Sequence, residues 1–171
     1  MSMASYELVP AVWEDVPVCV EILSAGRAFQ RHQGFVQWAD GYPGRKEVEA
    51  DVAAGKGYVL KVDGVIAAYM YLDFDGDPSY PAIRGAWHTE EPYTVIHRMA
   101  IGDGFRGKGL SGVAFRLVEE FSKAHGIYAL RIDTHADNKR MQHVVEKNGF
   151  SYCGIVLQNG GERLAYDKPL G

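Results

Sequence analysis

The sequence predicts a mixed α/β fold with a central, mostly antiparallel sheet and helices on both faces. The order of the elements and a single strand–helix–strand crossover over residues 93–133 carry this prediction. Strands are expected at residues 5–9, 58–62, 65–74, 93–101, 128–133, 150–157 and 162–168. Helices are expected at residues 12–31, 45–54, 108–125 and 137–148.

The first half of the chain combines a weak strand, two helices and a hairpin. Residues 12–31 place apolar side chains at helical spacing, with Pro17 near the start and Gly26 as a candidate break. Residues 33–45 are rich in glycine and aromatic side chains and predict a loop. Asp63–Gly64 joins two β-rich runs, which is a strong hairpin signal.

The second half begins with a long connection over residues 75–92, and loops of that length are often functional. The run at 108–125 has its apolar side chains on one helical face, and Gly126 suits the helix C-terminus. The helix at 137–148 ends at Gly149, and the last two strands pair across Asn159–Gly160.

Length and charge restrict the class of protein. The 171 residues predict a single domain over 1–171, and the net charge of −4 disfavours a nucleic-acid partner. No apolar run could span a bilayer and no signal pattern opens the chain, so no membrane partner and a cytoplasmic location are expected. Cys19 and Cys153 are far apart and are expected to be buried free thiols. No Cys/His group has zinc spacing, so no metal is expected.

The most informative segment is Met99–Gly112, MAIGDGFRGKGLSG, which joins a strand to a helix. Glycines let the backbone approach an anion closely, and a helix N-terminus offers unpaired N–H groups and a favourable dipole. Arg106 and Lys108 add positive charge. The segment therefore predicts a site for a phosphorylated ligand, with a merely tight turn as the alternative.

Two general phosphate-binding patterns offer alternative interpretations of this segment. Gly102, Gly104 and Gly107 form GxGxxG, and Asp133 could serve as the ribose acid of a dinucleotide site. However, too few parallel β-α-β units follow residue 133 for a dinucleotide fold. The P-loop pattern GxxxxGK[ST] fails at Gly109, where the hydroxyl that would hold magnesium is missing.

The loop resembles the acetyl-coenzyme A site of the GNAT superfamily, the GCN5-related N-acetyltransferases, whose pattern is Arg/Gln-x-x-Gly-x-Gly/Ala. Arg106, Gly107, Lys108, Gly109, Leu110 and Ser111 occupy that pattern, with Ser111 as a mild departure. The resemblance implies an acyl-CoA N-acyltransferase fold, acetyl-CoA (coenzyme A) as cosubstrate, and loop N–H groups around its pyrophosphate. A homodimer is a further family-level expectation.

The resemblance continues on both sides of the loop. It implies that Met99, Ala100 and Ile101 run beside the pantetheine arm and that Asn138 contacts it. Lys147 is a weaker candidate for the phosphoadenosine end.

Transfer to an amine needs a proton acceptor, because an alkylammonium has a pKa of about 10. His97 is the best candidate, since it lies two residues before Met99 and would share its side of the strand. A histidine bonded to the sheet or simply packed is the alternative. The family's usual acid is a tyrosine at the position of Val145, so Tyr152 is the substitute to test.

The acceptor is expected to be a primary amine of a small molecule. Aromatic side chains in loop-like stretches could line its site, or could equally seal the core: Trp38, Tyr42, Tyr80 and Trp87. Loop acids could attract a cationic amine, although such acids are more often solvated: Asp40, Asp73, Asp75, Asp77, Glu90 and Glu91. An NAD(P)-dependent oxidoreductase and a non-catalytic coenzyme A-binding module are the competing hypotheses.

Overall fold

A computed structural model describes residues 3–38, 41–158 and 160–171. The chain forms two compact units. The first unit comprises Met1–Leu72 and Arg98–Leu117, and the second comprises Asp73–His97 and Val118–Gly171. Strand β5 (Thr94–Ile101) and helix α3 (Leu110–Ala124) each contribute to both units.

The described strands form one sheet of eight in the order β1-β2-β3-β5-β6-β8-β7-β4. Strand β5 pairs with β6 in parallel, whereas the β1–β2, β2–β3, β6–β8, β7–β8 and β4–β7 pairs are antiparallel. Four α-helices accompany these strands in the described part of the chain. The predicted mixed α/β class with a mostly antiparallel sheet is therefore confirmed.

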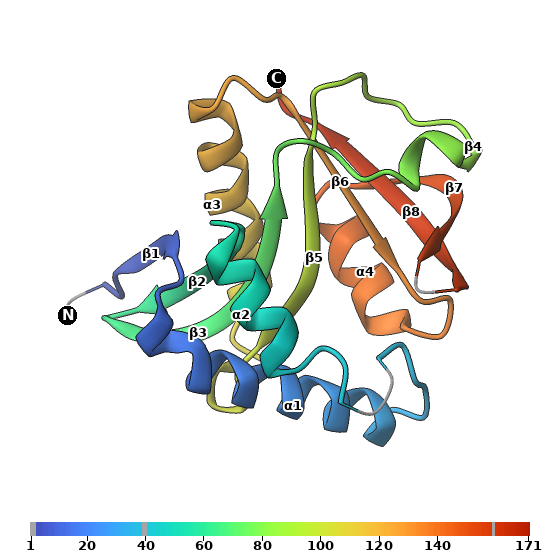
Figure 1. The fold of residues 1–171 in the computed structure, drawn as a ribbon. Helices are drawn as coiled ribbons and strands as arrows, with labels where there is room; N and C mark the ends of the chain where they lie inside the picture. The colour runs from blue at the N-terminus through green and yellow to red at the C-terminus, as the bar shows by residue number, and fades with distance from the viewer. Residues whose placement is uncertain (1–2, 39–40, 159) are drawn as a thin grey trace. The chain divides into compact units, whose positions relative to one another are not determined.

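The first unit contains strands β1 (Tyr6–Pro10), β2 (Gly57–Val62) and β3 (Val65–Asp73, of which residues 65–72 belong to this unit) and helices α1 (Val16–His32) and α2 (Arg45–Ala53). Figure 1 shows these two helices in blue and cyan. The β2–β3 hairpin turns at Asp63 (φ 50°) and Gly64 (φ 81°), two successive residues with positive φ. Such a turn matches the twist of the strands that it joins, so the Asp-Gly prediction is confirmed.

Helix α1 continues through Gly26, so the candidate break at this residue is wrong. A Cβ at Gly26 would lie 3.1 Å from Cζ3 of Trp38 and 3.4 Å from Cβ of Ala100. Glycine is therefore needed here for close packing rather than to end the helix. The core of the first unit gathers side chains from α1, α2, β2, β3 and β5: Val16, Cys19, Ile22, Leu23, Val48, Val59, Tyr69 and Ala100, with Ala11 and Trp38.

The second unit contains strands β4 (Arg84–Gly85), β6 (Ala129–Thr134), β7 (Ser151–Gln158) and β8 (Gly161–Pro169), and helix α4 (Lys139–Lys147). The predicted β7–β8 hairpin is confirmed, while Asn159 of its predicted turn lies outside the described residues. The core of this unit consists of Tyr80, Tyr93, Val95, Ala129, Val156 and Ala165.

Strand β4 lies inside the connection that was predicted to be a loop. Its Gly85 is paired with Gly154 of β7, and both have positive φ, 138° and 144°. A Cβ at either glycine would come within 2.2 Å of a backbone oxygen of the partner strand, Cys153 O or Arg84 O. The two backbones can approach this closely only because both residues lack side chains.

The remaining helical segments are short 3₁₀ turns at Trp13–Asp15, Tyr80–Ala82 and Asp103–Phe105. Helix α3 begins at Leu110 rather than at the predicted residue 108, because Gly109 has a positive φ of 71° that a helix cannot include. Across the described residues, none of the helices combines the length and apolar character that crossing a membrane requires.

Candidate functional site

The glycine-rich segment of the first unit forms an open loop ahead of α3. Gly107 (φ 76°) and Gly109 (φ 71°) have left-handed backbone conformations, and a Cβ at Gly104, Gly107 or Gly109 would meet no atom within 4 Å. The first N–H groups of α3, which begins at Leu110, have no acceptor inside the helix. These features suit the close approach of an anion such as a diphosphate.

The two cations of this loop have different roles. Arg106 forms an ion pair with Asp103, and its guanidinium lies over the ring of Phe29, 4.2 Å from the centroid. Lys108 is exposed. Arg106 therefore braces the loop, and the binding role predicted for residues 106–111 stays a prediction.

Strand β5 carries a conformational irregularity at Arg98, whose φ is 51°. Side chains alternate along a strand only while every residue is extended. The spacing of His97 and Met99 therefore does not place them on one side of the strand, contrary to the prediction from the sequence. Ala100 packs in the core of the first unit, and the N–H of Gly102 donates to Ala67 O at 2.7 Å.

Arg98 is held by a buried ion pair that sequence analysis missed. Its Nη2 and Nε lie 2.6 and 3.1 Å from the two carboxylate oxygens of Asp51, which is 4% exposed. The Tyr69 hydroxyl also donates to Asp51 at 2.5 Å. Burial would lower the pKa of Arg98, but the hydrogen bonds and charge of Asp51 outweigh that effect and raise it. Arg98 is therefore cationic, and its ion pair with Asp51 accompanies the left-handed backbone at this residue.

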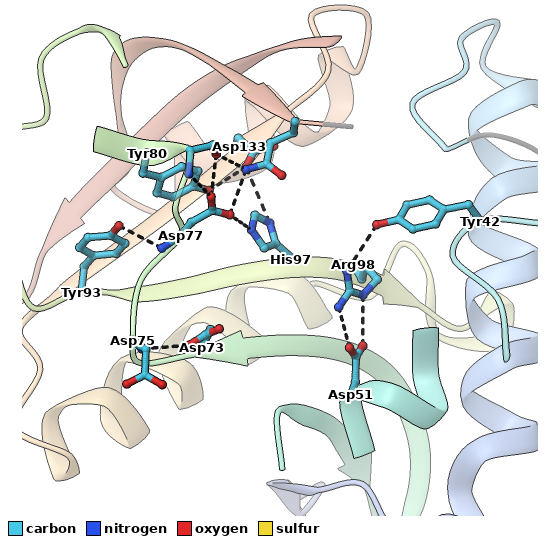
Figure 2. Close-up of polar contacts among 12 residues, drawn as sticks. Tyr42, Asp51, Asp73, Asp75, Asp77, Tyr80, Tyr93, His97, Arg98 and Asp133 are labelled. Atoms are coloured by element: carbon cyan, nitrogen blue, oxygen red, sulfur yellow. Dashed lines mark hydrogen bonds and ion pairs between the residues drawn. The ribbon is translucent and has the colours of Figure 1, made fainter. Parts of the chain in front are cut away.

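In the second unit, His97 is bound to Asp77 (Figure 2). Its Nε2 lies 2.8 Å from Asp77 Oδ2, which also accepts from Gln158 Nε2 at 2.9 Å, while Asp77 Oδ1 accepts from the N–H and hydroxyl of Ser79. Burial would raise the pKa of Asp77, but the hydrogen bonds from His97 and Ser79 outweigh it and hold the pKa well below its usual range. Asp77 is thus ionised and accepts only.

A second carboxyl group lies on the other side of the His97 ring. Asp133 Oδ2 is 3.7 Å from His97 Nδ1 and accepts a hydrogen bond from the Tyr80 hydroxyl at 2.7 Å. Burial raises the pKa of Asp133, against the opposing charge of His97 and the Tyr80 bond. Burial and the nearby Asp133 charge likewise raise the pKa of Tyr80, so its hydroxyl keeps its proton.

These contacts determine which nitrogen of His97 carries its proton in the neutral ring. Because ionised Asp77 only accepts, Nε2 must donate, and Nδ1 then carries the basic lone pair. A proton that arrives at Nδ1 faces the carboxyl oxygen of Asp133. The arrangement therefore suits His97 to accept a proton. Asp77 was noted in the sequence only as one of several loop acids.

Helix α4 presents the other residues that the resemblance singles out. Asn138 is its N-cap, and Oδ1 accepts from the N–H of Met141 at 3.0 Å. Lys147 is exposed in the last turn, and Val145 is fully buried. Tyr152 is 52% exposed and packs edge-on against Tyr166. The binding role of Asn138 and Lys147 and the acid role of Tyr152 stay predictions.

The four aromatic candidates for acceptor binding lie in different surroundings. Trp38 belongs to the core of the first unit, and Tyr42 packs against that core with its hydroxyl 3.4 Å from Arg98 Nη1. Tyr80 is fully buried in the core of the second unit, and Trp87 packs against that core and donates from Nε1 to Tyr80 O at 3.0 Å. Asp40 lies outside the described residues.

Comparisons with known proteins place the chain in a family. A model of the acetyltransferase (GNAT) family matches residues 24–150. A GNAT-family acetyltransferase from Streptococcus agalactiae 2603 is 32% identical, with a TM-score of 0.88 over 97% of this chain and 96% of that one. No curated protein matches the sequence significantly.

Two more distant structures share the fold. A GNAT-family acetyltransferase from Listeria monocytogenes 4b F2365 is 18% identical, with a TM-score of 0.75 over 96% of this chain and 95% of that one. The structure of AAC(6')-Ib in complex with parmomycin and acetyl-CoA is 19% identical, with a TM-score of 0.71 over 96% and 93%. The family match over most of the chain and the similarity to the streptococcal protein agree with the loop, and this chain belongs to the acetyltransferase (GNAT) family.

Proposed function

We propose that this protein transfers the acetyl group of acetyl-CoA to the primary amine of a small molecule, and that His97 accepts the proton of that amine. The observation that carries the proposal is the His97–Asp77 pair, in which an ionised carboxylate fixes the ring so that Nδ1 is the basic atom. Family membership supports an acyltransferase rather than the NAD(P)-dependent alternative. A cytoplasmic location and a small acceptor are part of the same proposal.

The residues of the first unit fit a coenzyme with a diphosphate. The open, left-handed glycines Gly107 and Gly109 and the start of α3 at Leu110 present backbone N–H groups without side chains in the way. Lys108 and Ser111 complete this segment. Bound acetyl-CoA supplies the acetyl group as a reactive thioester.

The proton of the amine defines the task of His97. An alkylammonium with a pKa of about 10 is mostly protonated at neutral pH, so an acceptor near the nitrogen speeds the reaction. Asp77 keeps Nε2 as the donor and orients the ring, as a carboxylate does for a catalytic histidine in general. Asp133, 3.7 Å from Nδ1, would stabilise the imidazolium that forms.

The leaving thiolate of coenzyme A has to be protonated, and the tyrosine that usually donates this proton in the family is absent from its position here. Val145 is fully buried and carries no proton to donate. Tyr152 has an exposed side chain and is the candidate donor, and water can also serve because a thiolate with a pKa of about 8.5 is protonated easily. Tyr152→Phe is therefore expected to lower turnover only modestly.

The test is a thiol-release assay with acetyl-CoA against a panel of small primary amines. His97→Gln is expected to lower kcat/KM by about 100-fold or more, the usual range for loss of general-base catalysis. Calorimetry should find its affinity for coenzyme A unchanged. His143→Gln, a substitution of an exposed histidine on α4, is the matched control and should retain full turnover.

Three outcomes separate the competing hypotheses. Unchanged turnover in His97→Gln would remove His97 as the base while leaving the acetyltransferase assignment intact. Coenzyme A binding without turnover on any amine would favour the non-catalytic module. That hypothesis is compatible with Val145 at the position of the family's usual acid. Failure of the folded wild-type protein to bind coenzyme A or acetyl-CoA would overturn the proposal as a whole.

A further inference from the structure

Three chemically active side chains of the second unit meet at a place with no role in the proposed transfer reaction. One atom from each of His88, Cys153 and Asp167 lies within 4.8 Å of the other two. His88 Nδ1 is 2.9 Å from Asp167 Oδ1 and 3.3 Å from Cys153 Sγ. The three residues are 65 and 14 positions apart in the sequence, which is why spacing predicted no metal site.

The backbone of β7 and β4 is shaped around this cluster. The register of β7 against β8 shifts between Tyr152 and Gly154, so Cys153 is the extra residue of a β-bulge. Bulges redirect a side chain that regular pairing would point elsewhere. The N–H of Ala86, two residues before His88, donates to Cys153 O at 3.0 Å and holds the two segments together.

Asp167 is held rigidly with one oxygen directed at the cluster. Its Oδ2 accepts three hydrogen bonds, from the N–H of His88 at 2.7 Å and from the N–H and hydroxyl of Thr89 at 2.9 Å each. Its Oδ1 faces His88 Nδ1. Arg131 in turn donates to Thr89 Oγ1 at 3.1 Å and to Thr89 O at 2.7 Å. Such outer contacts are what orients a metal-binding carboxylate.

We infer that His88, Cys153 and Asp167 form a three-ligand binding site for a zinc-class divalent cation. In a tetrahedral zinc site, bonds of about 2.0–2.3 Å place neighbouring ligand atoms about 3.3–3.6 Å apart. The distances of 2.9 and 3.3 Å from His88 Nδ1 therefore have to widen by only a few tenths of an ångström. One imidazole, one thiolate and one carboxylate suit Zn²⁺, and the two anionic ligands balance its charge.

The exposure of the three ligands gives the ion a route and an open position. Asp167 is fully buried and Cys153 is 7% exposed, whereas the His88 side chain is 54% exposed. The ion would enter from the His88 side and keep a water as its fourth ligand. Bound there, it would fasten the segment around His88 to β7 and β8. Binding releases the thiol proton of Cys153 to solvent, while the neutral His88 ring binds through Nδ1 and carries its single proton on Nε2.

The test uses the chain of 171 residues, stripped of metal with a chelator and titrated with Co²⁺ and then with Zn²⁺. Co²⁺ is expected to produce thiolate charge-transfer absorption and visible bands typical of tetrahedral coordination, saturating at about one ion per chain, and Zn²⁺ should abolish both. His88→Ala removes an exposed side chain and should fold normally, yet weaken binding by more than about 100-fold. Cys153→Ser should abolish the charge-transfer band.

The matched control is Cys19→Ser, which removes the other buried cysteine, in the first unit, and should leave the cobalt spectrum unchanged. Thr89→Val should keep the ligands but weaken Zn²⁺ binding about 10- to 100-fold, because it removes one of the three hydrogen bonds that orient Asp167 Oδ2. Absence of cobalt bands in the wild-type protein, or equal Zn²⁺ affinity in wild type and His88→Ala, would overturn the inference and leave the cluster as a hydrogen-bonded anchor. Neither result bears on the proposed acetyl transfer.

Discussion

Helix α2 carries two ion pairs that differ in burial, and they provide a sharp test of what holds strand β5. Asp51 pairs with Arg98 through side chains that are 5% and 18% exposed, whereas Glu49 pairs with Arg45 through side chains that are 39% and 65% exposed. Removing one partner of a buried pair leaves a charge without compensation and costs about 3–5 kcal/mol. An exposed pair of the same kind contributes about 0.3–0.5 kcal/mol.

We expect Asp51→Asn to lower the stability of the protein by about 3 kcal/mol, because it leaves the Arg98 cation buried and weakens the acceptor of the Tyr69 hydroxyl. For a chain of this size, that loss corresponds to a fall in Tm of about 6–12 °C. Glu49→Gln, two residues earlier on the same helix, should change Tm by less than about 2 °C.

The measurement is thermal unfolding followed by far-ultraviolet circular dichroism, with urea titration as a check that the m-value is unchanged. Similar Tm values for Asp51→Asn and Glu49→Gln would refute the reasoning, since burial would then make no difference.

A second comparison isolates the contribution of the backbone conformation at Arg98. Arg98→Gly and Arg98→Ala both lose the ion pair, but glycine adopts a φ of 51° freely and should be more stable than alanine by about 1 kcal/mol.

Three further predictions concern other parts of the chain. Gly154→Ala should destabilise the protein by more than about 2 kcal/mol in thermal melts, because the new Cβ would lie 2.2 Å from Arg84 O, whereas Gly104→Ala, in open space, should melt like wild type. The folded-state pKa of Asp77 is depressed, so its stabilising effect is present above the unfolded pKa of about 3.9 and is lost as pH falls through the lower folded value. The Tm advantage of wild type over Asp77→Asn should therefore shrink at and below about pH 4. A Tm difference that stays constant with pH would contradict this. Burial, with the charge of Asp15, raises the pKa of Cys19 to about 12. In the Cys153→Ser protein, which keeps Cys19 as its one cysteine, an aromatic disulfide reagent at pH 8 should therefore label Cys19 only after unfolding. Rapid labelling of Cys19 in the native protein would count against its burial.

Local signals in the sequence identified most elements of the fold. The Asp63–Gly64 turn and the apolar face of the 108–125 run depend on neighbouring residues, and both elements are present with ends shifted by at most two residues. Strand β4 was missed, because two residues have no periodicity and their pairing depends on Gly154, about 70 positions away. The left-handed conformation of Arg98 was also unpredictable, since a bulky residue there gives no local signal.

Only part of the candidate site could be predicted from the sequence, because local segments give a signal and contacts between distant residues do not. The glycine loop and His97 could be singled out as candidates because they lie in one continuous segment that resembles a known motif. The partners of His97 come from elsewhere: Asp77 is 20 positions earlier in a connection without regular structure, and Asp133 stood out only as a possible ribose ligand. The fold, rather than any sequence pattern, brings two carboxyl groups to one ring.

The path of the chain through the two units has an evolutionary consequence. It passes from one unit to the other after Leu72, His97 and Leu117, so neither unit is encoded by one uninterrupted stretch of gene. A single recombination event cannot replace one unit by a counterpart from another protein and leave the other complete. Exchanging either unit would require crossovers at all three of these positions.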